Sequence, residues 1–167
     1  MSAPAATATP PAPMEARDLD WVLALNTVFE TELSPLTAAR LAELRDQAFA
    51  ARVVQPQAAF LLAFDQDADY DSPNFLHFRT LYDRFAYVDR IAVSPDHRRK
   101  GLAGALYQDL FALARAAGHQ RVVCEVNSDP PNPGSFAFHE ALGFQEVGTA
   151  YLDDRGKRVV YLACQIA

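Results

Sequence analysis

Three basic residues directly precede a glycine-rich turn in the stretch SPDHRRKGLAGALYQDL, residues 94–110. The preceding apolar run ends at Val93, Pro95 interrupts it, and helical spacing of apolar residues begins near Gly101. The first N–H groups of a helix have no acceptor within the helix and lie at its positive pole, so they bind anions, which small residues allow to approach closely. The sequence therefore predicts a pyrophosphate-binding loop made of Arg98, Arg99, Lys100, Gly101, Leu102, Ala103 and Gly104.

The alternative for this basic triplet is a surface loop whose charges are simply solvated. Two other phosphate-binding fingerprints do not fit, because the chain has no G-x-x-x-x-G-K-[ST] run and GLAGAL at 101–106 departs from G-x-G-x-x-G. The formal net charge of −6 argues against sequence-independent binding of nucleic acid, which needs a basic surface. The basic cluster therefore indicates that an anion binds at this loop.

The elements that must position this loop alternate between helix and strand. Apolar spacing predicts helices over 18–33, 37–52, 73–85, 101–118 and 134–142, and strands over 52–55, 58–65, 85–95, 121–127, 144–152 and 157–166. A strand, a helix and a strand in succession across 85–127 imply a parallel pair, whereas the last two strands read as an antiparallel hairpin. We expect a mixed α/β fold with helices flanking a central β-sheet.

The 167 residues suit one domain, which we place at 15–167, preceded by a flexible Ala/Pro-rich tail at 1–14. No run approaches the roughly 20 apolar residues of a membrane span, and we expect a soluble, cytoplasmic protein. Cys124 and Cys164 lie in apolar strand-like runs, which favours buried, reduced thiols over a metal pair or a disulfide.

Two motifs together resemble the GNAT superfamily of N-acetyltransferases. Arg98, Gly101 and Ala103 match its R/Q-x-x-G-x-G/A loop, and NPGSFAFHEALGF at 132–144 resembles N-x-x-[AS]-x-x-F-Y-x-x-x-G-F. The resemblance implies a partly splayed sheet and acetyl-CoA as cosubstrate, with no metal. It also implies that the backbone of Ile91, Ala92 and Val93 binds the pantetheine arm as an added strand, and it adds Asn127, Asn132, Ser135 and Phe138 to the cofactor site.

Acetyl transfer to an amine needs a base to deprotonate the amine and a means of stabilising the departing thiolate. Glu125 lies in a C-E-V sequence that resembles the strand on which the family often carries a base, and the alternative is a glutamate paired with an arginine. Asp89 is a reserve base, with an arginine ion pair as its alternative. His139 replaces the tyrosine that usually serves as the acid, so it either donates a proton or only shapes the pocket.

The acceptor side is predicted from acidic and polar residues in the segments that shape the acceptor site in the resembled family. Glu30, Asp71 and Asn74 are the candidates for attracting a small cationic amine. Tyr87 and Asp89, which strand alternation places on one face with Ile91 and Val93, are expected to form the other wall of the acceptor cleft. The alternative for the spaced aspartates at 65–71 is a solvated connector. An EF-hand is excluded, because Tyr70 and Leu76 occupy the positions that need glycine and glutamate.

The sequence leaves three other functions open. The first is a regulatory module that binds CoA without catalysis, and the second is an acetyltransferase acting on protein N-termini or lysines. The third is a nucleic-acid-binding domain that uses the basic triplet. We expect direct transfer rather than a cysteine intermediate, because Cys124 should point to the strand face opposite Glu125. Dimerisation through the final hairpin is left open.

Overall fold

A computed structural model of the chain describes residues 9–129 and 131–166. The helices are α1 (Leu19–Val28), α2 (Glu30–Leu33), α3 (Ala38–Gln47), α4 (Pro73–Leu81), α5 (Leu102–Ala116) and α6 (Pro133–Ala141), with short 3-10 turns η1 (Ala16–Asp18) and η2 (Pro95–His97). The strands are β1 (Ala12–Pro13), β2 (Ala50–Val54), β3 (Ala59–Asp65), β4 (Ala86–Val93), β5 (Arg121–Asp129), β6 (Gln145–Leu152) and β7 (Lys157–Gln165). They form one sheet in the order β1-β2-β3-β4-β5-β7-β6. The predicted mixed α/β fold is confirmed.

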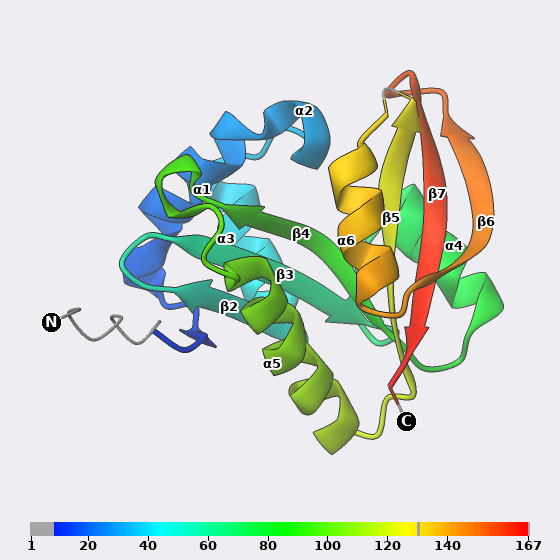
Figure 1. Cartoon of the computed structure of the whole chain (residues 1–167), viewed down its shortest axis with the longest axis horizontal. Helices are drawn as coiled ribbons and strands as arrows, with labels where there is room; N and C mark the ends of the chain where they lie inside the picture. Colours follow the sequence, from blue (N-terminus) through cyan, green and yellow to red (C-terminus); the bar gives the residue numbers. More distant parts are fainter. Residues whose placement is uncertain (1–8, 130, 167) are drawn as a thin grey trace, which may run out of the picture.

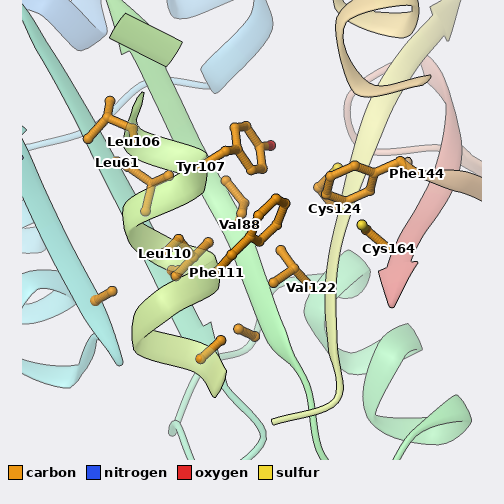
Figure 2. Packing of buried hydrophobic residues seen from close by; sticks show 14 of the residues in the cluster. Leu61, Val88, Leu106, Tyr107, Leu110, Phe111, Val122, Cys124, Phe144 and Cys164 are labelled. Atoms are coloured by element: carbon orange, nitrogen blue, oxygen red, sulfur yellow. The ribbon is translucent and has the colours of Figure 1, made fainter. Parts of the chain in front are cut away.

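Helices cover both faces of the sheet (Figure 1). α5 and α6 pack on one face, where Leu106, Tyr107 and Leu110 of α5 contact buried strand residues such as Leu61 and Val122. Figure 2 shows these α5 side chains directed toward the strands. α1, α3 and α4 cover the other face over a second buried cluster that is rich in aromatic rings. Strands buried on both faces explain the near-continuous apolar runs of the sequence.

The sheet opens between β4 and β5. These neighbours are parallel and pair only at Ala86↔Val122 and Tyr87↔Val123. Beyond this point the two strands diverge (Figure 1), and each keeps a partner only on its outer side, β3 for β4 and β7 for β5. The edges that face each other across the opening therefore carry backbone groups that no strand satisfies, which leaves room for a ligand.

A β-bulge interrupts β4 at the opening. Leu62 pairs with Arg90 but the next residue, Ala63, pairs with Val88, so Asp89 is the extra residue. We expected Tyr87 and Asp89 to share a face with Ile91 and Val93, and this is wrong because the bulge shifts the alternation. Tyr87 belongs to the cluster under α4, whereas Val88 belongs to the cluster under α5.

Several predicted boundaries differ from the structure. The segment 37–52 is not one helix: α3 ends at Gln47, and Ala50–Val54 forms β2, which pairs with β3 along its whole length. The segment 18–33 is two helices, since α1 ends before Phe29. The expected tail at 1–14 is too long, because β1 pairs with β2 and the Met14 side chain is buried. Residues 1–8 of that tail lie outside the described residues.

Two further features follow from the described part of the chain. Cys124 and Cys164 are buried free thiols, as predicted. None of the helices between residues 9 and 166, residue 130 aside, has the length and apolar character needed to cross a membrane.

Candidate active site

The opening between β4 and β5 contains a cavity of about 330 Å³. Its walls come from the C-terminal half of β4, the middle of β5, α6, and the α1–α2 region at Phe29 and Leu33. This size is that of a small-molecule site. Ten of the predicted site residues line it: Asp89, Ile91, Ala92, Val93, Arg98, Glu125, Asn127, Asn132, Ser135 and His139.

The basic loop leads from β4 into α5 beside this cavity. Gly101 is the N-cap of α5 and adopts φ of 74°, in the left-handed region that glycine enters without strain. A Cβ atom at Gly101 or at Gly104 would meet no protein atom within 4 Å, so the first turn of α5 is open on these sides. Arg98, Arg99 and Lys100 are exposed at this pole. The loop therefore fits the pyrophosphate that its sequence predicted.

The residues of this loop have separate roles. The side chain of Leu102 is buried in the core under α5, so only its backbone is available to an anion. Arg98 lines the cavity, and its guanidinium lies 5.8 Å from the ring centroid of Phe29.

The predicted cofactor residues around α6 have structural contacts of their own. Asn132 accepts a hydrogen bond from the backbone N–H of Ser135 and so caps the helix. Phe138 packs against Tyr107 outside the cavity lining.

Glu125 is held by two donors from neighbouring elements. The Tyr87 hydroxyl lies 2.8 Å from one carboxylate oxygen and 3.0 Å from the other. The side-chain N–H of Asn74, on α4, donates to Glu125 at 2.9 Å. Tyr161 of β7 donates to the carbonyl oxygen of the Asn74 side chain at 2.9 Å, which fixes the amide with its N–H group toward Glu125.

The environment of Glu125 brings the pKa of its carboxyl close to neutral pH. Burial raises the pKa of this carboxyl to about 7, the hydrogen bond from Tyr87 opposes the rise, and the nearby Asp89 adds to it. A carboxylate with this pKa is present in both protonation states at physiological pH, so it can accept a proton and release it again. Glu125 lies on the same face of β5 as Val123, since Val123 and Tyr87, the hydrogen-bond partner of Glu125, both belong to the cluster under α4.

His139 is buried and uses both ring nitrogens within the protein. Nδ1 lies 2.7 Å from the backbone carbonyl oxygen of Ser135, which can only accept, so Nδ1 carries the hydrogen. Nε2 must then accept from the Tyr107 hydroxyl, 2.6 Å away. Burial lowers the pKa of His139. The neutral ring has no N–H left for the cavity, so the hydrogen bonds favour the reading in which His139 shapes the pocket.

Tyr107 is a cavity residue that the sequence did not indicate. It follows Leu106 in the apolar stripe of α5 and is fully buried, yet it lines the cavity between the diverging strands. Figure 2 shows its ring leaving α5 toward β5, where Cys124 lies. Burial raises the pKa of the Cys124 thiol well above its ordinary value. Cys124 lines the cavity. Its raised pKa keeps the thiol protonated and therefore weakly nucleophilic.

Asp89 forms the arginine ion pair that was its alternative. Arg90 donates to it from Nε at 3.0 Å, and Tyr70 donates to its other oxygen at 2.8 Å. Both members of the ion pair are largely buried. Since both oxygens of the Asp89 carboxylate are engaged by Arg90 and Tyr70, Glu125 is the better placed base.

The four predicted acceptor residues do not gather in one place. Glu30 is exposed and does not line the cavity. Asp71 is exposed beside Arg40 at 3.4 Å and lines a different hollow. Asn74 and Tyr87 are buried behind Glu125 and hold it, rather than facing the cavity. The direct contacts of Asn74 and Tyr87 are thus with Glu125, a role that the sequence did not indicate.

Across the described ranges, 9–129 and 131–166, no cluster of three or more His, Cys, Asp or Glu is arranged to hold a metal ion.

Solved structures with this architecture include several acetyltransferases. The ribosomal-protein-S18-alanine N-acetyltransferase from Escherichia coli matches with a TM-score of 0.68 and 20% identity, covering 94% of this chain and 93% of its own. Ard1 from Thermoplasma volcanium matches with a TM-score of 0.75 and 18% identity, covering 96% and 99%. Naa20 from Chaetomium thermophilum, solved with a bisubstrate analogue, matches with a TM-score of 0.73 and 17% identity, covering 93% and 85%. At these identities the likeness shows a shared fold.

The sequence itself matches a protein family over the part of the chain that builds the cavity. The profile of the Acetyltransferase (GNAT) family covers residues 27–144, which include β4, the basic loop, α5, β5 and α6. The motifs singled out at 98–103 and 132–144 both lie within this range. The chain belongs to the GNAT family of acetyltransferases.

Proposed function

We propose that this protein transfers an acetyl group from acetyl-CoA directly to the primary amine of a small molecule. The observation that carries the proposal is the position of Glu125, a carboxyl with a pKa near 7 on the wall of the cavity between the splayed strands. The open first turn of α5 flanks the same cavity. A base and an anion cradle on one site are what acetyl transfer from a pyrophosphate-bearing thioester requires.

The cofactor half of the site is formed by backbone groups. The N–H groups from Arg99 to Gly104 would hold the pyrophosphate, with Arg98 adding charge at the cavity wall. The unpaired edge of β4 at Ile91–Val93 would bind the pantetheine arm as an added strand. Bound acetyl-CoA supplies the thioester whose acetyl group is transferred.

The chemical half of the site removes a proton and accommodates a leaving group. An amine arrives mostly as ammonium, and Glu125 takes its proton, directly or through a water molecule. Tyr87 and Asn74 keep the carboxylate in place during this step. A thiol has an ordinary pKa of about 8.5, so the thiolate is a good leaving group without a dedicated acid. The Tyr107–His139 pair forms part of the cavity wall.

Direct transfer rather than an acetyl-cysteine intermediate is supported by the state of Cys124. Its thiol is buried and its pKa is raised, and Glu125, on the opposite face of β5, does not hydrogen-bond to it.

Release of free thiol from acetyl-CoA, measured across a panel of amines, tests the proposal. Amine-dependent release that disappears in Glu125→Gln is the expected result. The main rival is a regulatory module that binds CoA without catalysis. Binding of acetyl-CoA with no thiol release above hydrolysis for any amine would establish that rival instead.

A further inference from the structure

Arg90 connects the main cavity to a second one. Its side chain lines the 330 Å³ cavity that holds Glu125 and also a hollow of about 410 Å³ on the far side. This second hollow lies between the segment after α2, the start of α4 and the turn between β6 and β7. Arg90 is only 8% exposed, although its β4 neighbours at the bulge lie next to open space. The charge of Arg90 is paired with Asp89, but its guanidinium carries more N–H groups than this one carboxylate binds.

Most of the hydrogen-bonding capacity of Arg90 is used to fix its orientation. Nε donates to Asp89 at 3.0 Å, and Nη1 donates to the side-chain oxygen of Asn26 at 2.9 Å and to the backbone oxygen of Ser34 at 3.0 Å. Nη2 has no acceptor among residues 9–129 and 131–166. A guanidinium held on three sides with two N–H groups free is preorganised to bind one oxygen-bearing anion.

A second donor faces the same hollow. Ser72 is 7% exposed and precedes Pro73, the first residue of α4, yet its hydroxyl does not cap the helix and bonds to no atom of the described residues. The positive pole of the nine-residue helix α4 lies at this point. Nη2 of Arg90 and the hydroxyl of Ser72 thus both offer hydrogen to a ligand, and neither group has an acceptor among the described residues.

The main cavity is lined by charged residues of both signs, Glu32, Asp89, Arg90, Arg98 and Glu125, of which Asp89 and Arg90 form an ion pair. Glu125 is on the side of the main cavity, where a cationic amine must be deprotonated. At the rim of the second hollow, Arg40 lies 3.4 Å from Asp71 and Arg155 lies 3.9 Å from Asp154, so these pairs leave little net charge. Deeper inside, Nη2 of Arg90 and the hydroxyl of Ser72 are donors without an acceptor among the described residues.

We infer that the acceptor is a free amino acid, whose ammonium group lies at Glu125 while its carboxylate binds Nη2 of Arg90 and the hydroxyl of Ser72. This inference rests on the proposed function, because it assigns a substrate class to the same site. Glu125 and Arg90 both line the main cavity, so residues of one site can hold the two charged groups of a zwitterion. The side chain of the amino acid extends toward the hollow between α4 and the β6–β7 turn.

The test compares matched acceptors in wild-type protein by thiol release. The twenty amino acids are assayed beside their carboxamides, their decarboxylated amines and C-terminally amidated tetrapeptides. For the preferred side chain, kcat/KM for the free acid should exceed that for the amide by roughly 10- to 100-fold, the value of a charge-assisted hydrogen bond. In Arg90→Gln this ratio should fall toward 1, and Ser72→Ala should lower it several-fold.

A matched control separates loss of recognition from loss of fold. Arg52 is also a partly buried, ion-paired arginine, 2.8 Å from Asp109, but it lines neither hollow. Arg52→Gln should lower stability and leave the ratio of acid to amide unchanged. If Arg90→Gln does not fold, the wild-type acceptor series and Ser72→Ala still decide the question.

Each failure has its own signature. Amides, simple amines or amidated peptides that react as fast as the free amino acids would overturn the inference and leave acetyl transfer standing. If acetyl-CoA binds but none of the amines in the panel causes release of thiol, the proposed function and the inference are overturned together.

Discussion

The hydroxyl of Tyr87 on β4 lies 2.8 Å from the carboxylate of Glu125 on β5. Tyr87 belongs to the last residue pair before the two strands separate, and Glu125 is two residues beyond its partner, Val123. The bond therefore joins the strands at the base of the opening. The same contact that supports the splayed sheet also places the base on the cavity wall.

Replacing this carboxyl by an amide should abolish proton abstraction. We predict that Glu125→Gln lowers kcat by roughly 100-fold or more, the contribution of a positioned base, while acetyl-CoA still binds. In wild type, kcat/KM should rise with pH through about 7 as Glu125 loses its proton. The variant should lack this limb of the pH profile. An unchanged profile in Glu125→Gln would assign the base to another group.

The second prediction concerns Tyr161, the cross-strand neighbour of Glu125 on β7, whose hydroxyl donates to Asn74 and not to the carboxylate. In Tyr161→Phe the Asn74 amide is free to turn its oxygen toward Glu125, which disfavours the charged carboxylate. The lower limb of the kcat/KM profile should move to higher pH, while the rate on the plateau changes less than threefold. Tyr151→Phe, an exposed tyrosine on β6, is the control and should leave the profile in place. A purely structural role for Tyr161 predicts lower stability with no movement of this limb.

The third prediction separates a shaping role of His139 from proton donation. Since its Nε2 accepts from Tyr107 and burial lowers its pKa, the ring is neutral and has no proton for the departing thiolate. His139→Gln and Tyr107→Phe should each reduce kcat by less than about tenfold and keep the shape of the profile above pH 7. A decline of rate with rising pH that is present in wild type and absent in His139→Gln would identify His139 as an acid after all.

The fourth prediction is a pH-dependent effect of Glu125 on stability. Its pKa is raised in the folded state relative to about 4.5 in the unfolded chain, so its favourable contribution is complete below pH 4.5 and is lost as the pH rises through about 7. Glu125→Gln should therefore gain stability relative to wild type between pH 5 and pH 8, by up to about 3 kcal/mol. Urea denaturation at both pH values measures this difference. Glu146→Gln, an exposed carboxyl on β6, should show none.

The sequence predicted the parts of the fold that local patterns determine. The motif loop, α5 and the β6–β7 hairpin appear where apolar spacing and glycines indicated them. Residues 48–52 were misread as helix because AFAAR suits a helix locally, whereas in the fold pairing with β3 makes residues 50–52 part of a strand. Local propensity does not carry that information.

The role of a site residue was predictable where its residue type and local sequence indicate that role. It was not predictable where the role depends on a contact with a residue far away in the sequence. Glu125 was identified because its C-E-V sequence resembles the strand that often carries a base in the family, and it lines the cavity. Tyr161 and Arg90 were missed, because their partners are 87 and 64 residues away in the sequence. The bulge at Asp89 places Tyr87 on the face of β4 opposite to the one expected. No feature of the sequence AYVDRIAV indicates a bulge at this position.

The central claim is that acetyl-CoA binds the first turn of α5, and calorimetric titration of acetyl-CoA into Gly104→Glu tests it most directly. Gly104 lies in the first turn with open space at its Cβ, and glutamate there improves helix propensity and suits the helix dipole. The variant should melt no lower than wild type and yet lose micromolar binding of acetyl-CoA through steric and charge repulsion of the pyrophosphate. Gly156→Glu, in the distant β6–β7 turn, should bind as wild type does. Undiminished binding by a folded Gly104→Glu would contradict the assignment of the anion site.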